Sequence, residues 1–232
     1  MKITLSFEKT ISDDLSIVVD VLRASTTITA ALNNFDEVIP CFSPEEAFKI
    51  YENINGVLAG ERNGAKIEGF HVGNSPETIE NYDIGDKTPK LILTTTNGTR
   101  IIENINSTIL IGSLINAKAV AKAALNISKN HINVVMAGRK GHFAIEDFLA
   151  AGEILHWIIN QISPDENYEL SEYALSAILA RENYSELKKA FYNSYSGKKL
   201  CDLGYQNDVD YCIQKNISEN VAIYEKGLLK LL

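Results

Sequence analysis

Charged side chains directly follow several of the apolar stretches in this chain. The clearest case is residues 16–27 (SIVVDVLRASTT), where a β-branched run is followed by Asp20, Arg23 and three hydroxyl groups. Such a run is typical of a strand that is buried on both faces. Because ligands of open α/β sheets bind beyond the carboxyl ends of the strands, this junction is a candidate binding site.

The arginines show the same placement. The chain has only five, and four of them follow predicted strands: Arg23, Arg62, Arg100 and Arg139. On a parallel sheet these four would lie along one edge, where planar guanidinium groups pair bidentately with phosphate, carboxylate or sulfonate. The alternative is four unrelated surface arginines. In a protein with a formal net charge of -8, clustered arginines predict a pocket for a small polyanionic substrate.

Carboxylates occur among these arginines. A carboxylate beside phosphate-binding groups is how proteins hold a hard cation such as Mg²⁺, with waters and substrate oxygens completing its shell. The predicted metal ligands are Asp20, Glu61, Asp147 and Asp208, and the predicted catalytic residues are Asp20, Arg23, Glu61 and Asp147. A solvated helix acid or a local ion pair is the alternative for Asp147. Glu146 precedes Asp147 on the same predicted helix and is expected to point in a different direction, so only one of the two side chains would face the site.

Two turns add neutral polar groups. Residues 71–76 (HVGNSP) predict a turn followed by a helix start with free N–H groups, and residues 94–99 (TTTNGT) form a second hydroxyl-rich turn. Both follow predicted strands, on the edge that carries the arginines. The predicted substrate-binding residues are therefore Arg62, Asn74, Ser75, Asn97, Gly98, Thr99, Arg100 and Arg139.

Alternating strand and helix patterns would position these side chains. Predicted strands cover residues 2–7, 15–21, 37–41, 56–60, 90–94, 108–112 and 132–137, and predicted helices cover 25–34, 44–53, 75–82, 99–104, 116–129 and 144–162. This alternation favours parallel strands with right-handed helical crossovers. The predicted fold class is α/β, a three-layer α/β/α arrangement with a largely parallel sheet.

The sequence beyond Pro164 is more polar and richer in tyrosine. Helical patterns cover residues 169–180, 183–193 and 208–215, and a strand is predicted at 220–224. The tail 164–232 is therefore expected to form a helical cap that contributes fewer chemical groups than the first part of the chain, with Tyr195 as a packing residue.

No linker composition marks a boundary, so residues 1–232 are predicted to form a single α/β domain. Similar strand-to-turn junctions around residues 15–60 and 90–137 are compatible with duplicated βα units and two similar halves.

Composition excludes several classes of protein. The 232 residues are 45% hydrophobic, and the acidic balance argues against nucleic-acid and membrane partners. Three cysteines without a CxxC spacing predict neither a disulfide framework nor a zinc site. No signal peptide or membrane span is recognisable, so a cytoplasmic protein is expected. A homodimer is compatible with the sequence.

Four motifs in order resemble the 2-phosphosulfolactate phosphatase (ComB) family. They are residues 20–27 (DVLRASTT), 60–62 (GER) with 69–76 (GFHVGNSP), 95–99 (TTNGT), and 137–139 (AGR) with Glu146, Asp147 and Gly152. The resemblance covers about residues 15–155, and residues 200–204 and 208–212 look like the C-terminal region of that family.

The resemblance implies a Mg²⁺-dependent phosphatase. Its reaction would convert (2R)-2-phospho-3-sulfolactate into (2R)-3-sulfolactate and phosphate, a step toward coenzyme M. The residues by themselves leave two other classes open: an isomerase or lyase that acts on a small phosphorylated acid, and a regulatory protein that binds such a polyanion.

Overall fold

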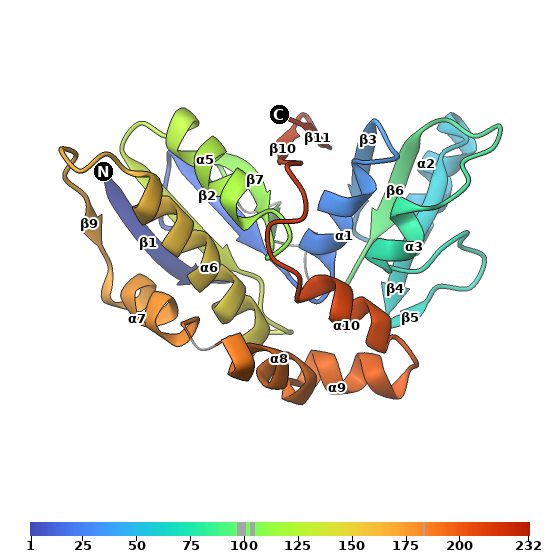
Figure 1. The fold of residues 1–232 in the computed structure, drawn as a ribbon. Helices are drawn as coiled ribbons and strands as arrows, with labels where there is room; N and C mark the ends of the chain where they lie inside the picture. The colour runs from blue at the N-terminus through green and yellow to red at the C-terminus, as the bar shows by residue number, and fades with distance from the viewer. Residues whose placement is uncertain (97–100, 103–104, 183) are drawn as a thin grey trace.

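The apolar stretches form one twisted sheet, shown in Figure 1 in a computed structural model that describes residues 1–96, 101–102, 105–182 and 184–232. In this described part the sheet has 11 strands, in the order β5-β4-β6-β3-β11-β10-β7-β2-β8-β1-β9. The strands are β1 (Lys2–Phe7), β2 (Leu15–Val19), β3 (Glu37–Cys41), β4 (Val57–Arg62), β5 (Ala65–Lys66), β6 (Lys90–Thr94), β7 (Thr108–Gly112), β8 (His131–Met136), β9 (Glu169–Leu170), β10 (Ala222–Glu225) and β11 (Leu228–Leu231).

The sheet consists of two parallel groups joined by a hairpin. Strands β7, β2, β8, β1 and β9 are parallel to one another, and so are β3, β6 and β4. The C-terminal hairpin β10–β11 lies between the groups and pairs antiparallel with β7 and β3. Its turn residues Lys226 and Gly227 have φ of 51° and 85°, the combination of a two-residue type I′ turn. The predicted largely parallel sheet is confirmed.

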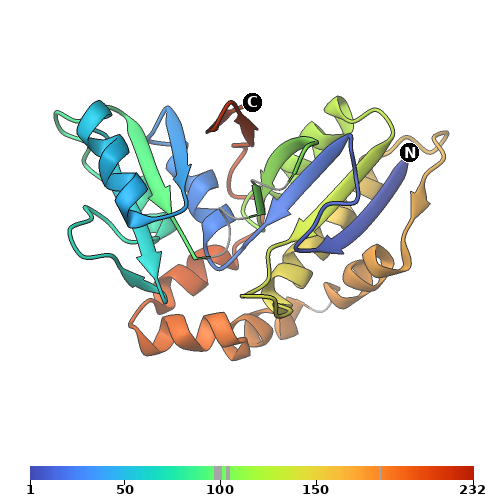
Figure 2. The same cartoon turned by 180° about the vertical axis from the view of Figure 1, so that it is seen from behind.

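Helices cover both faces of the sheet, as the three-layer prediction requires. They are α1 (Ala24–Ala31), α2 (Pro44–Ile54), α3 (Pro76–Glu80), α5 (Ala117–Ile127), α6 (Ile145–Gln161), α7 (Glu172–Ala180), α8 (Tyr184–Asn193), α9 (Tyr195–Asp202) and α10 (Gln206–Cys212). Helices α5 and α6 pack on β2, β7 and β8 (Figure 1), and α2 packs on β3, β4 and β6 on the opposite side of the molecule (Figure 2). The predicted helix 99–104 lies mostly outside the described residues.

Strand β2 is buried on both faces, which explains its β-branched sequence. Ile17 and Val19 belong to the core beneath α5 and α6, whereas Val18 packs in a second core with Ile28 of α1. All five residues of the strand are buried. Burial on both faces holds the strand rigidly, so Asp20, which comes next in the chain, has a fixed position.

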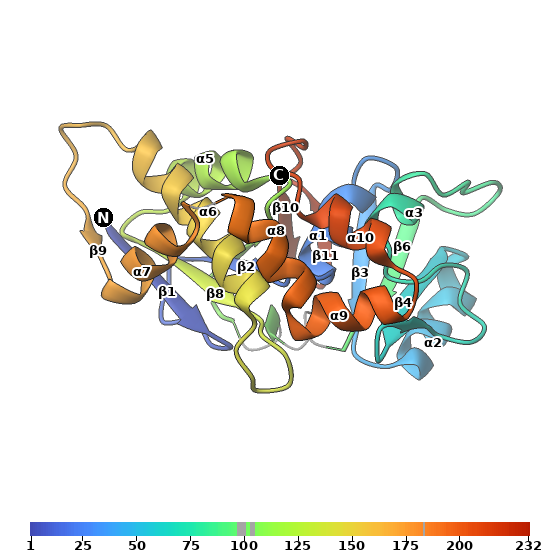
Figure 3. The ribbon, with the colours of Figure 1, turned by 60° about the horizontal axis from the view of Figure 1, so that its bottom comes forward.

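The tail crosses the carboxyl ends of the parallel strands. Helices α8, α9 and α10, which we call the bridging helices, lie along this edge in Figure 1, and Figure 3 shows the same edge from below. Helix α8 packs on α6 and α10 packs on α3, so the bridging helices connect the two strand groups.

The prediction of a helical tail over residues 164–232 needs two corrections. Helix α9 was not predicted, and the chain ends in a two-stranded hairpin within the sheet where a single strand was predicted. The predicted strand 220–224 becomes the first strand of that hairpin. The second strand has only four residues, too few to show a clear apolar alternation.

The stretches 15–60 and 90–137 do not coincide with the two strand groups. Stretch 15–60 supplies β2 to one strand group and β3 and β4 to the other. Stretch 90–137 supplies β7 and β8 to the group that contains β2, and β6 to the group that contains β3 and β4. In the part of the chain that the structure describes, no helix is long and apolar enough to cross a membrane.

Candidate active site

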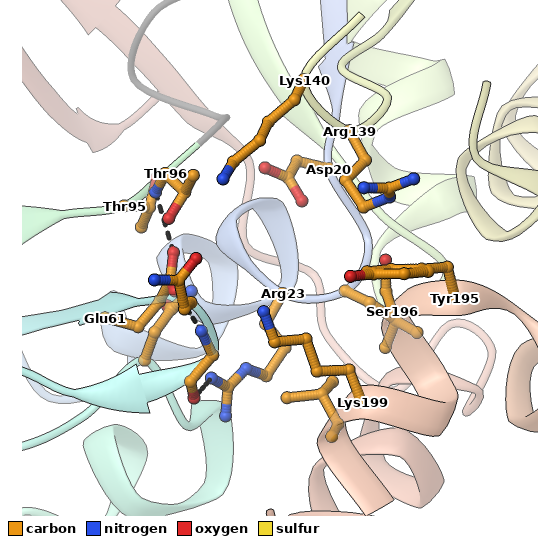
Figure 4. Close-up of a pocket in the computed structure, with 15 residues that line it drawn as sticks. Asp20, Arg23, Glu61, Thr95, Thr96, Arg139, Lys140, Tyr195, Ser196 and Lys199 are labelled. Atoms are coloured by element: carbon orange, nitrogen blue, oxygen red, sulfur yellow. Dashed lines mark hydrogen bonds between the residues drawn. The ribbon is translucent and has the colours of Figure 1, made fainter. Parts of the chain in front are cut away.

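One pocket lies at the carboxyl ends of β2, β4, β6 and β8 and is closed from below by α9 (Figure 4). It has a volume of about 710 Å³ including its open mouth. Its walls carry the charged residues Asp20, Arg23, Glu61, Arg139, Lys140 and Lys199. Four cations face two carboxylates, so an acidic protein presents a locally positive pocket, which suits an anion.

Asp20 is fixed by the start of α1. Its backbone N–H donates to Ser25 Oγ at 3.2 Å, and Ser25 N–H donates back to the Asp20 carbonyl at 2.8 Å. The backbone N–H of Ala24 lowers the pKa of the Asp20 carboxyl. Two of the hydroxyls expected to face a ligand thus shape the junction instead, because Thr26 Oγ1 also donates to a backbone carbonyl, that of Val21.

The surroundings of Asp20 favour its neutral form. Its side chain is buried, with 7% exposed. Burial is the largest cause, followed by the charges of Glu61 and Glu146, and together they raise the pKa of Asp20 to about 7. Arg23 acts in the opposite direction but does not compensate. A bound cation would relieve this repulsion.

Glu61 shapes a second wall of the pocket from the end of β4. Its Oε1 accepts from Thr96 N–H at 2.8 Å and its Oε2 accepts from Gly64 N–H at 2.6 Å. The second bond closes the turn between β4 and β5, in which Asn63 and Gly64 have φ of 55° and 88°. Each oxygen keeps a further lone pair, so Glu61 can still bind a ligand.

Arg23 and Asp208 form a buried ion pair. Arg23 Nη1 donates to Asp208 Oδ2 at 2.5 Å, and Arg23 Nη2 donates to the carbonyl of Gly64 at 2.9 Å. The other oxygen of Asp208 accepts from Ser75 Oγ at 2.6 Å. The structure therefore places Asp208, a predicted metal ligand, in a junction between α10, α1 and α3 and not in the pocket wall.

Asp147 lies behind the pocket wall. Its two oxygens accept from the N–H groups of Val21 and Gly138, both at 2.9 Å, so it ties the end of β2 to the end of β8. Burial, then Asp20 and Glu146, raise its pKa well above the usual range. Glu146 and Asp147 are both buried, and neither is part of the pocket wall, so they do not both face the site.

Arg139 and Lys140 reach the pocket from a tight turn after β8. Arg139 and His142 exchange backbone hydrogen bonds at 2.8 and 2.9 Å, and Lys140 and Gly141 between them have φ of 48° and 80°. The Arg139 guanidinium lies 3.7 Å from the centre of the Tyr195 ring. Neither Arg139 nor Lys140 has an ion-pair partner among the described residues.

Arg62 points elsewhere. Its guanidinium donates to the carbonyls of Glu61 and Phe42, at 2.7 and 3.3 Å, and to Thr94 Oγ1 at 2.9 Å, and it is not part of the pocket wall. Of the four arginines predicted to share one edge, Arg23 and Arg139 line the pocket. The predicted residues Asn97, Gly98, Thr99 and Arg100 lie outside the described part of the chain.

Two neutral side-chain oxygens in the pocket wall lack a hydrogen-bond partner among the described residues. Asn74 Oδ1 and Thr96 Oγ1 are buried and have no hydrogen-bond partner within the described residues. Buried acceptors in folded proteins are nearly always satisfied, so orphaned ones in a pocket point to a ligand or water. Ser75, predicted with Asn74, instead begins α3 as its N-cap and holds Asp208.

Helix α9 supplies pocket residues that were not predicted. Tyr195, Ser196, Lys199 and Leu200 all line the wall. The tail supplies fewer pocket residues than the first part of the chain, but Tyr195 was wrongly expected to be a packing residue: with 59% of its surface exposed, it stacks on Arg139. Ser194 caps this helix by accepting from Gly197 N–H, and the serine itself, a preferred N-cap residue, was the available signal.

The donor set fits one hard cation rather than a metal cage. No group of three or more histidine, cysteine, aspartate or glutamate side chains in the described residues could hold a metal ion. Mg²⁺ needs only one or two carboxylates, because waters and substrate oxygens complete its shell. Asp20 and Glu61 are the two carboxylates in the wall, and their mutual repulsion fits this role.

Fold and pocket together define an α/β protein with a mixed-charge site for a small anion at the carboxyl ends of its strands. Sequence comparison agrees with that class. Residues 3–227 match the family described as 2-phosphosulpholactate phosphatase, and the chain belongs to that family.

Individual relatives match along nearly the whole chain. The 2-phosphosulfolactate phosphatase of Methanothermobacter thermautotrophicus is 46% identical over 232 residues, covering 100% of this chain and 96% of the relative. That of Methanocaldococcus jannaschii is 38% identical, covering 94% and 92%. A probable 2-phosphosulfolactate phosphatase of Clostridium novyi is 37% identical, covering 92% and 90%.

Proposed function

We propose that this protein is a Mg²⁺-dependent phosphatase that hydrolyses (2R)-2-phospho-3-sulfolactate to (2R)-3-sulfolactate and phosphate. The observation that carries the proposal is a pocket in which Asp20 and Glu61 lie with Arg139, Lys140 and Lys199, three cations without ion-pair partners in the described part of the chain. The names of the relatives support the same reaction. The enzyme would act in the cytoplasm, in a step of the coenzyme M biosynthetic type.

The charges of the substrate match those of the pocket. A three-carbon acid with a phosphate, a carboxylate and a sulfonate carries three anionic groups. Arg139, Lys140 and Lys199 face the pocket without an ion-pair partner in the described residues. Each of the three cations can pair with one anionic group of the substrate, whereas a singly charged ligand would leave two of the cations unpaired.

Asp20, a carboxylate in the pocket wall, has the position of the group that handles the water proton. In the reaction, the water oxygen forms a bond to phosphorus while the bond from phosphorus to the C2 oxygen breaks. Asp20 would orient the water, accept its proton and return it to the leaving oxygen. One carboxylate within reach of both oxygens can serve both steps.

The remaining wall residues would bind and orient. Lys140 reaches toward the space between Asp20 and Thr96 in Figure 4, where it would neutralise phosphoryl oxygens. Mg²⁺, when bound by Asp20 and Glu61, would withdraw charge from the phosphoryl group. The N–H bonds from Thr96 and Gly64 hold Glu61 in place for this task.

Phosphate release from phosphosulfolactate, measured with Mg²⁺ and after a chelator, tests the proposal. The expected result is phosphate release that the chelator abolishes and that added Mg²⁺ restores. Conversion of the substrate without phosphate release would indicate an isomerase. Tight binding without any conversion, under every metal condition, would indicate a regulatory binding protein instead.

A further inference from the structure

Lys199 is the cation that the bridging helices contribute to the pocket wall. It is half-buried on α9 and has no ion-pair partner in the described residues. Its neighbour Lys198 is exposed and does not line the pocket. The helix therefore presents one ammonium group to the pocket and one to solvent.

The stem of Lys199 passes over the turn that Glu61 and Arg23 fix. A Cβ added to Gly64 would lie 3.7 Å from Lys199 Cε and 2.9 Å from Leu203 Cδ1. Gly64 itself donates to Glu61 and accepts from Arg23. The Lys199 side chain therefore lies close to the part of the pocket wall that Gly64 forms.

The charged groups divide the pocket into two ends. Asp20 and Lys140 lie toward one end in Figure 4, whereas Lys199 and Tyr195 project from α9 at the other. The group that reacts must meet Asp20. The α9 end is therefore left for a part of the substrate that is bound but not hydrolysed.

The shapes of the cations distinguish the two remaining anions. The guanidinium of Arg139 lies flat on Tyr195 and presents a planar fork, which matches a planar carboxylate. The ammonium of Lys199 is a point charge with three donors that rotate freely, which suits the three oxygens of a sulfonate.

We infer that Lys199 is a specificity-determining residue that binds the sulfonate of the substrate from α9. The inference rests on the proposed function for the identity of the substrate. Binding energy from this remote group would distinguish phosphosulfolactate from analogues with the same phosphate but no sulfonate.

The test compares two substrates in two variants. Lys199→Met keeps the length of the side chain and removes its charge, and Lys198→Met makes the same change one residue away on the exposed side. For Lys199→Met, the loss of kcat/KM on phosphosulfolactate should exceed the loss on 2-phospholactate at least about tenfold, as expected for one charge-assisted hydrogen bond. Lys198→Met should resemble the unchanged protein on both substrates.

Equal losses on the two substrates would overturn the inference. If the unchanged protein releases phosphate from neither substrate, the proposed function fails, and binding of the product is then measured by calorimetry. A drop of at least about tenfold in the affinity of Lys199→Met for 3-sulfolactate, without a comparable drop for lactate, supports the sulfonate site. An unchanged affinity for 3-sulfolactate refutes it.

Discussion

Replacing Asp20 by asparagine should make the free protein more stable and nearly inactive. Burial, Glu61 and Glu146 raise the pKa of Asp20 from 3.8 to about 7. Each pKa unit corresponds to about 1.4 kcal/mol, so the ionised side chain destabilises the folded state by about 4 kcal/mol. A neutral asparagine has the same shape and avoids this cost.

The raised pKa of Asp20 makes the stability of the folded state depend on pH. Because the folded state binds the proton of Asp20 more tightly than the unfolded state does, the stability from this group is fully present below pH 3.8. It is lost as the pH rises through about 7. At pH 8 without divalent cations, Asp20→Asn should therefore melt about 8–16 °C above the unchanged protein, and at pH 4 the two should melt at nearly the same temperature.

Turnover of the same two proteins is measured after Mg²⁺ is added. Asp20→Asn should lower kcat at least about 100-fold, which is typical of the loss of one charged group from a transition state. The control is Asp13→Asn, which removes an exposed carboxylate from the loop before β2 and should change neither quantity. A variant that melts at a lower temperature than the unchanged protein at pH 8, or that retains near-normal turnover, would refute the reasoning.

Three further changes test the supports of the pocket. Asp147→Ala leaves two buried N–H groups without an acceptor and should lower the free energy of unfolding in urea by about 2–4 kcal/mol. Gly138→Ala puts a Cβ 2.2 Å from Phe7 Cε2 at a φ of 62°, so it should lower the melting temperature and raise KM more than Gly141→Ala, whose Cβ meets nothing within 4 Å. Arg139→Ala should cut kcat/KM at least about 100-fold and Arg62→Ala less than about tenfold, because only Arg139 lines the pocket.

Local patterns were enough to predict most of the sheet. The β-branched run before Asp20 became a strand buried on both faces, as its composition indicated. The short strands β5 and β11 were missed, although both follow two-residue turns whose residues have positive φ, at Asn63-Gly64 and Lys226-Gly227. An Asn-Gly pair is itself a hairpin signal, and strands of two to four residues give no other.

Tertiary pairing limited the prediction of the site. Arg23 was expected to bind an anion, and its guanidinium is instead engaged by Asp208, which lies 185 residues further along the chain. Such a partner is not visible from local sequence. The contribution of Lys199 depends in the same way on where the bridging helices cross the sheet. By contrast, Asp20 directly follows β2, and Glu61 lies near the end of β4. Strand order alone was therefore enough to bring the two carboxylates to one edge of the sheet.

A crystal structure of the enzyme soaked with Mg²⁺ and 3-sulfolactate tests the central claim most directly. The account predicts one metal ion about 2.1 Å from a carboxylate oxygen of Asp20 and one of Glu61. The sulfonate should contact Lys199, and Asp208 should remain paired with Arg23. A metal bound by Asp208 or Asp147 would contradict this claim. So would a product that lies outside the pocket at the carboxyl ends of β2 and β4.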